Sequence, residues 1–212
     1  MSPARYKLVI FDFDGTLADS FGWFLDTFDS IADRFDFKRL DRSNLDALRQ
    51  MDARELMRLH DVPLWKVPMI AAFARKQQSQ DLHKIRPFNG ISEVLVELSG
   101  RGIKIAVVTS NTQTNVERVL GPDITSHIDH FNCGSSLFGK TAKFRAVAKA
   151  FDLEPNEVLA IGDEVRDIEA AKQAGCASGA VTWGYSATER LEKEHPQHLF
   201  ATPQDIAAVF RP

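Results

Sequence analysis

The stretch Lys7-Leu-Val-Ile-Phe-Asp12-Phe-Asp14-Gly-Thr16 decides the fold. Its residues 8–11 form a short, continuous apolar run, which is typical of a strand buried on both faces of a parallel sheet. Gly15 supplies a turn residue that ends the run. Since Asp12 and Asp14 follow the run directly, we predict a central strand whose carboxyl end carries acidic groups.

Three further apolar runs, at residues 103–108, 158–161 and 177–182, follow stretches with helical spacing. Strands that alternate with helices predict an α/β fold, a doubly wound, Rossmann-like parallel sheet covered on both faces. In such sheets ligands bind beyond the carboxyl ends of the strands. The polar segments 109–111 and 162–163 directly follow two of these runs, so we expect them to lie near Asp12.

The pattern changes between residues 18 and 86, where helical spacings dominate and no strand is evident. Phe21, Phe24 and Phe28 have the spacing of the buried side of a helix. We therefore expect two domains: a catalytic core, formed by residues 1–17 and 87–212, and an inserted α-helical cap, formed by residues 18–86.

Composition limits the partners and the location of the protein. The 212 residues are 44% hydrophobic, which is enough for one sizeable core with a modest insertion. A net charge of -3 gives no general attraction to nucleic acid or to an anionic membrane. No apolar segment approaches the length of a membrane span, and the two cysteines lack the spacing of a zinc site. We expect a cytoplasmic monomer or homodimer that binds neither nucleic acid nor membranes.

Asp12 and Asp14 are two residues apart in an extended segment, so their side chains point the same way. Two carboxylates this close repel each other, and Mg²⁺ is the natural cation between them because it binds carboxylate and phosphate oxygens. Asp163 and Asp167, four residues apart, are spaced to supply or orient further ligands. We therefore predict a Mg²⁺ site.

Four motifs follow one another along the chain: Asp12-Phe-Asp14-Gly-Thr16, Val107-Val-Thr109, Lys140, and Gly162-Asp163-Glu-Val-Arg-Asp167. In this order they resemble the haloacid dehalogenase superfamily, in its phosphoglycolate phosphatase-like branch with a helical type 1 cap. The resemblance implies a Mg²⁺-dependent phosphatase of a small phosphorylated metabolite, with 2-phosphoglycolate as the favoured substrate. Family members that cleave carbon–halogen bonds lack the second aspartate, so its presence argues against a dehalogenase.

The resemblance also implies roles for single residues. Asp12 would attack phosphorus, and Asp14 would act as general acid and base. Lys143 is an alternative to Lys140, but we favour Lys140 because it follows Phe138-Gly139 in an expected loop, whereas Lys143 is expected to be helical. The predicted catalytic residues are Asp12, Asp14, Thr109 and Lys140; the metal ligands are Asp12, Asp14 through its main-chain carbonyl, Asp163 and Asp167; the substrate-binding residues are Gly15, Thr16, Ser110, Asn111 and, from the expected specificity loop of the cap, Arg49.

Three alternatives remain open at this point. A sugar phosphomutase would form the same aspartyl-phosphate but transfer it. A phosphonatase would cleave a carbon–phosphorus bond through a Schiff base on a cap lysine. A non-catalytic binding protein would keep the fold without the chemistry, although the complete set of aspartates weighs against it.

Overall fold

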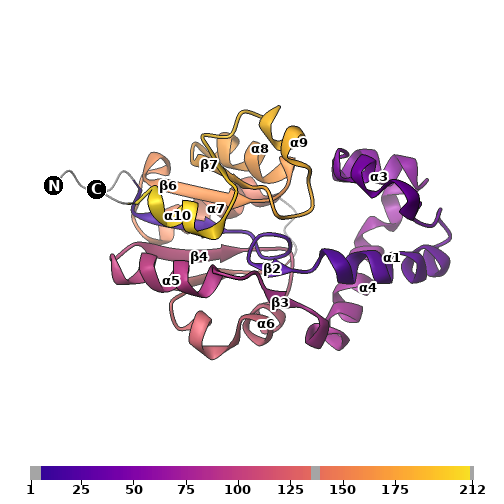
Figure 1. Ribbon diagram of the computed structural model, residues 1–212, viewed down its shortest axis with the longest axis horizontal. Helices are drawn as coiled ribbons and strands as arrows, with labels where there is room; N and C mark the ends of the chain where they lie inside the picture. The colour runs from indigo at the N-terminus through magenta and orange to yellow at the C-terminus, as the bar shows by residue number, and fades with distance from the viewer. Residues whose placement is uncertain (1–5, 135–138, 211–212) are drawn as a thin grey trace.

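The computed structural model describes residues 6–134 and 139–210 and contains a central parallel sheet with helices on both faces (Figure 1). The strands follow the order β5-β4-β1-β6-β7-β8, and every neighbouring pair is parallel. Their bounds are β1 Leu8–Phe11, β4 Lys104–Val108, β5 His130–Asn132, β6 Val158–Gly162, β7 Ala177–Val181 and β8 His198–Phe200. The predicted doubly wound α/β fold is therefore confirmed.

Alternation of side chains along β1 explains why its apolar run is continuous. Val9 and Phe11 belong to the hydrophobic core on one face, whereas Leu8 and Ile10 belong to the core on the other. All four side chains have no solvent exposure, as expected for a strand that must be apolar on both sides. The first face is covered by α5 (Ile91–Gly100), α6 (Gln113–Thr125) and α10 (Pro203–Ala208), and the second by α7 (Gly139–Ala150) and α8 (Val165–Ala174).

The register of the sheet brings three polar segments to one edge. Phe11 pairs with Val107 of β4 and with Ile161 of β6. Asp12, Thr109 and Asp163 therefore follow the ends of three adjacent strands, which is the position where α/β sheets bind ligands.

A helical unit lies to one side of the sheet and contains α1 (Phe21–Phe35), α2 (Leu45–Arg49), α3 (Ala53–Leu59) and α4 (Val67–Gln80) (Figure 1). It has a small hydrophobic core of its own around Phe28, Ala32 and Leu40. The chain enters and leaves this unit through a two-stranded antiparallel ribbon, β2 (Ala18–Asp19) and β3 (Arg86–Pro87). The expectation that residues 18–86 contain no strand is wrong at β2 and at the first residue of β3, because a two-residue strand carries no periodicity in the sequence. One expected domain boundary falls directly before β2 and the other within β3, and the division into core and cap stays a prediction.

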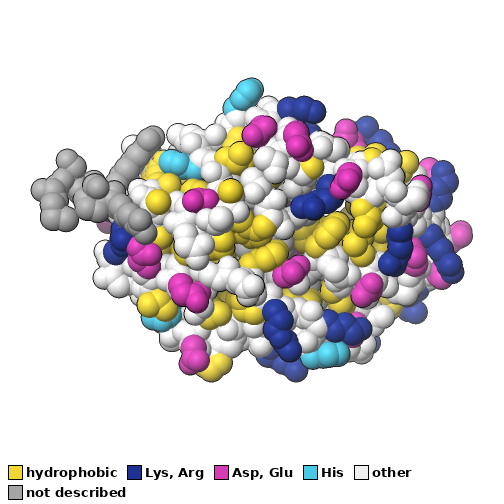
Figure 2. Space-filling view, viewed as in Figure 1, with side chains coloured by type: hydrophobic (Ala, Val, Ile, Leu, Met, Phe, Trp, Pro, Cys, Tyr) yellow, Lys and Arg dark blue, Asp and Glu magenta, His cyan; other side chains and the backbone are white. Residues whose placement is uncertain are grey.

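The surface has no dominant charge on the face that Figure 2 shows, since acidic and basic side chains are interspersed over it. None of the helices in residues 6–134 and 139–210 is long and apolar enough to cross a membrane.

Candidate active site

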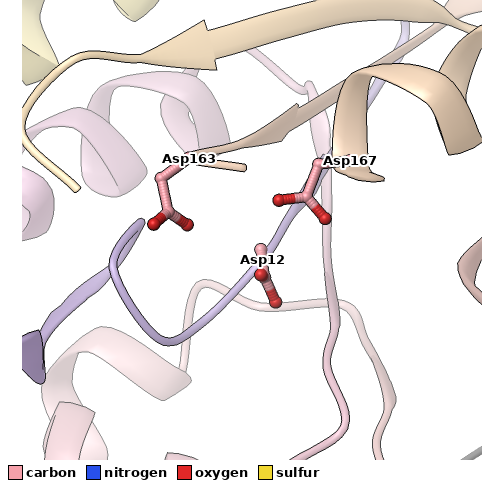
Figure 3. A group of neighbouring side chains, drawn as sticks. All are labelled: Asp12, Asp163 and Asp167. Atoms are coloured by element: carbon pink, nitrogen blue, oxygen red, sulfur yellow. The ribbon is translucent and has the colours of Figure 1, made fainter. Parts of the chain in front are cut away.

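Three buried carboxylates meet at the carboxyl edge of the sheet (Figure 3). Asp12 follows β1, Asp163 follows β6, and Asp167 lies in the first turn of α8. One oxygen atom of each carboxylate lies within 4.8 Å of one oxygen atom of each of the other two. The sequence motifs predicted that these three residues would be neighbours, and the structure brings them together.

Burial makes this cluster electrostatically costly. Burial raises the pKa of Asp12 from 3.8 to about 6, with Lys140 opposing the shift and Asp167 adding to it. The pKa of Asp163 is also raised well above its ordinary value, first by burial and then by the negative charges of Glu164 and Asp12. The ionised cluster therefore needs positive charge close by.

Lys140 supplies part of that charge. Its Nζ atom lies 2.6 Å from Oδ2 of Asp12 and also contacts Oδ1 of Asp167. Burial alone would lower the pKa of Lys140, but the two carboxylates raise it above its usual range, so the ammonium stays charged. Lys140 is the second residue of α7, so the prediction that it lies in a loop is wrong; Phe138, on which that prediction also relied, lies outside the described residues.

The donor set fits a divalent cation. The Lys140 ammonium can balance only one of the three carboxylates, and Arg166, whose charge also acts on the cluster, is paired with Glu164. The donors of the cluster are hard oxygen ligands. Mg²⁺ takes carboxylate oxygens together with waters and phosphate oxygens. Asp12, Asp163 and Asp167 are the residues that would hold it.

Lys143, the alternative phosphate-binding lysine, has a different environment. Its ammonium group donates to three main-chain carbonyls, those of Thr109 at 2.7 Å, Asn132 at 3.1 Å and Gly134 at 2.5 Å. Burial lowers its pKa. These contacts join the ends of β4 and β5 to α7, so the geometry favours Lys140 as the lysine at the reaction centre.

The carboxylate of Asp14 is not part of the buried cluster. Its Oδ1 atom accepts a hydrogen bond from Nε2 of Gln78 at 2.7 Å, and its Oδ2 atom accepts one from Nδ2 of Asn111 at 3.0 Å. Metal binding through the main-chain carbonyl of Asp14 stays a prediction. Gln78 lies on α4 of the helical unit, and no motif or spacing in the sequence pointed to it.

The predicted phosphate-binding residues surround the same edge. The Oγ1 atom of Thr109, a buried residue, accepts a hydrogen bond from the main-chain N–H of Asn111 at 3.0 Å. Thr16 donates to Oδ1 of Asp163 at 2.9 Å, so in this structure it orients a carboxylate of the cluster. Ser110 is exposed. Phosphate binding by these residues stays a prediction.

Gly15 is required by its surroundings. Its φ angle is +77°, and a Cβ atom at this position would lie 2.1 Å from Oδ2 of Asp163. Only glycine can both adopt this conformation readily and leave room for the carboxylate.

The loop after β7 joins the cluster to the helical unit. The main-chain N–H of Tyr185 donates to Oδ2 of Asp163 at 2.8 Å, and the Tyr185 hydroxyl lies 3.1 Å from Oγ of Ser20. Arg49 donates through Nη2 to the carbonyl of Gly184 at 2.6 Å and through Nε to that of Tyr185 at 3.3 Å. Arg49, the last residue of α2, thus bonds the helical unit to this loop of the core. Its predicted contact with substrate stays a prediction. Sequence reasoning missed the main-chain role of Tyr185, because a backbone donor leaves no trace in side-chain patterns.

Fold and site together define an α/β protein with three buried aspartates and a lysine clustered at the edge of its sheet. Residues 9–181 match the haloacid dehalogenase-like hydrolases, and the chain therefore belongs to this family. The resemblance stated from the four motifs is confirmed, as is the prediction of a hydrolase.

Known relatives agree with this assignment. A phosphoglycolate phosphatase from Synechococcus elongatus is 29% identical over 201 residues, which cover 94% of this chain and 95% of the relative. Two solved structures share the fold at lower identity. A haloacid dehalogenase-like hydrolase from Streptococcus pneumoniae has a TM-score of 0.79 at 19% identity and covers 98% of this chain and 99% of its own. A predicted phosphoglycolate phosphatase from Haemophilus somnus has a TM-score of 0.76 at 22% identity, with the same coverage of 98% and 99%.

Proposed function

We propose that this protein is a Mg²⁺-dependent phosphatase that hydrolyses a small phosphate monoester, with 2-phosphoglycolate as the preferred substrate. The observation that carries the proposal is the position of Asp12, which shares one buried edge with Asp163, Asp167 and Lys140. The name of the Synechococcus elongatus relative supports the choice of substrate.

The chemistry proceeds in two displacements. A carboxylate oxygen of Asp12 attacks phosphorus, the bond from phosphorus to the leaving oxygen breaks, and Asp14 gives its proton to that oxygen. Asp14 then takes a proton from the water that attacks the aspartyl-phosphate, which releases phosphate and restores Asp12. Mg²⁺, when bound, offsets the negative charge of the carboxylates and polarises the phosphoryl group.

Thr109 and Lys140 would hold the phosphoryl oxygens during both displacements. Donors placed before the reaction stabilise the charge that develops on these oxygens, and such positioning supplies much of the catalysis of phosphoryl transfer. Residues 18–86 would act as the cap that excludes water and contacts the leaving group. The cytoplasmic location and the oligomeric state stay predictions.

The surroundings of the lysines in the helical unit do not support a phosphonatase, which needs a lysine free to form a Schiff base beside Asp12. This unit contains four lysines, of which three are engaged elsewhere and the fourth is exposed: Lys38 pairs with Asp61 at 2.7 Å, Lys66 donates to the carbonyl of Phe35 at 2.6 Å, Lys84 pairs with Asp81 at 3.0 Å, and Lys76 is exposed.

Phosphate release from a panel of phosphate monoesters, with Mg²⁺ and without a bisphosphate activator, tests the proposal. We expect turnover by the natural chain, with 2-phosphoglycolate among the best substrates. The isosteric Asp12→Asn variant should lose roughly two orders of magnitude in rate or more, because it removes the nucleophile. Absence of phosphate release from every ester would refute the proposal, and release only with a bisphosphate activator would favour a mutase.

A further inference from the structure

A chain of side-chain amides leads to Asp14, and one main-chain group fixes the orientation of every amide in it. The N–H of Thr112 can only donate, and it donates to the Asn111 side-chain oxygen Oδ1 at 2.8 Å. The Asn111 Nδ2 atom must therefore be the donor that faces Asp14 and Oε1 of Gln78. Because Oε1 of Gln78 faces Asn111, its Nε2 group is the donor that reaches Oδ1 of Asp14 at 2.7 Å.

The two donors come from different parts of the chain. Asn111 follows β4 of the sheet, whereas Gln78 lies near the end of α4 in the helical unit and is only 4% exposed. Each oxygen of the Asp14 carboxylate therefore receives one amide hydrogen, one from the core and one from the helical unit. Without Gln78, Oδ1 of Asp14 would lose its amide donor, and the carboxylate would be freer to rotate.

We propose that Gln78 is a positioning residue for Asp14. Its amide holds the carboxylate of the general acid and base in one orientation, and it does so only while the helical unit occupies its present place against the core. The helical unit thus contributes to the proton transfers as well as covering the site. This inference rests on the proposed function, because it takes Asp14 to be the proton donor and acceptor.

A double-mutant cycle tests whether Gln78 acts through Asp14. Gln78→Met keeps the length of the side chain and removes its amide. We expect kcat on 2-phosphoglycolate to fall by roughly 10- to 100-fold, the range that follows from losing a hydrogen bond to a charged group, with a much smaller change in KM. In the Asp14→Asn background the same substitution should change kcat by less than about threefold, because the group that it positions is already impaired. Gln80→Met, at an exposed position of the same helix, should leave both constants unchanged.

The leaving group gives a second readout. An alkyl alcohol must be protonated as it departs, whereas p-nitrophenolate leaves readily without a proton. Gln78→Met should therefore slow formation of the aspartyl-phosphate much more with 2-phosphoglycolate than with p-nitrophenyl phosphate in single-turnover experiments. A merely structural role would slow both substrates equally.

The outcomes separate this inference from the function on which it rests. Suppose that the natural chain releases phosphate. If Gln78→Met then retains the kcat of the natural chain, or lowers kcat by the same factor in the Asp14→Asn background as in the natural one, Gln78 does not position Asp14. The phosphatase proposal stands in both cases. If the natural chain hydrolyses no phosphate monoester, both fail together. Thermal unfolding checks that Gln78→Met folds. If it does not, Gln78→Leu, which also removes the amide and adds no charge beside Asp14, carries the same test.

Discussion

The Nζ atom of Lys140 lies 2.6 Å from Oδ2 of Asp12, whereas the ammonium of Lys143, three residues later in α7, donates to three main-chain carbonyls. One lysine therefore contacts the carboxylate cluster, and the other joins main-chain segments of the core. Lys140→Met should lower the rate of phosphate release by roughly two orders of magnitude or more, because it removes the charge that we propose binds the phosphoryl oxygens.

Lys143→Met is the matched control, with a different expected defect. It should lower the free energy of unfolding by about 1–3 kcal/mol, because the buried carbonyl of Thr109 and the half-buried carbonyls of Asn132 and Gly134 lose the ammonium that donates to them. That loss corresponds to a decrease in Tm of roughly 2–4 °C for each kcal/mol. Steady-state kinetics and thermal unfolding of both variants check the assignment. A stable Lys143→Met protein that loses more activity than Lys140→Met would reverse it.

The raised pKa of Asp12 predicts how the metal-free protein responds to pH. Its folded pKa of about 6 lies above the ordinary value of 3.8, so between these values the folded state keeps a proton that the unfolded state has released. This contribution to stability is fully present below about pH 4 and is lost as the pH rises through about 6. Asp163 acts in the same direction, because its pKa is also raised.

Thermal unfolding with a chelator between pH 4 and 7 measures this effect. The Asp12→Asn variant should show a smaller loss of stability over the window, since an amide does not titrate there, and it isolates Asp12 from the other ionisable groups. An identical pH dependence of both proteins would show that Asp12 does not titrate in this range.

Mg²⁺ should stabilise the protein at neutral pH, because it offsets charges that burial makes costly. A ligand at one hundred times its dissociation constant adds about 2.7 kcal/mol to the free energy of unfolding. Asp163→Asn should abolish most of the resulting increase in Tm. Asp14→Asn should retain it, since the Asp14 side chain is bonded to two amides and lies outside the cluster. Loss of the increase in Asp14→Asn alone would place the cation elsewhere.

Gly184 provides a steric test of the loop that holds Asp163. A Cβ atom on Gly184 would lie 2.2 Å from Cβ of Asp163 and 2.5 Å from the carbonyl oxygen of Gly15. Either the loop that contains Gly184 or the Asp163 side chain must therefore move. Gly184→Ala should lower the free energy of unfolding by about 1–3 kcal/mol, as overpacking does, and weaken the stabilisation by Mg²⁺.

Gly22→Ala is the control, because a Cβ atom there meets nothing within 4 Å and the residue lies in α1. It should be neutral or stabilising by up to about 1 kcal/mol, the difference in helix propensity between glycine and alanine. Tm measurements with and without Mg²⁺ on both variants test whether the close approach at Gly184 limits stability and Mg²⁺ binding. Equal losses in the two variants would argue that the close approach at Gly184 is not restrictive.

The sequence alone determined the parallel sheet and the edge at which the aspartates meet. Runs such as residues 8–11 and 158–161 are apolar at every position because both faces of their strands are buried. This requirement applies to consecutive residues, so it is visible in a short stretch of sequence. Asp12 and Asp163 follow such runs directly, so the order of residues along the chain is enough to place them at the carboxyl ends of strands. Elements with weak local signals, namely β2, β5, β8 and α10, had no such pattern to predict them.

Only the tertiary structure decided which side chains meet across distant segments. Lys140 and Lys143 lie within one turn of α7, and no local pattern tells which of them reaches Asp12 and which reaches the carbonyls at the ends of β4 and β5. Gln78 carries no motif, and its bond to Asp14 exists because α4 packs where it does against the core. The physical reason is that periodicity and turn chemistry act between near neighbours in the chain, whereas these contacts depend on how a helical unit and a sheet are placed relative to each other.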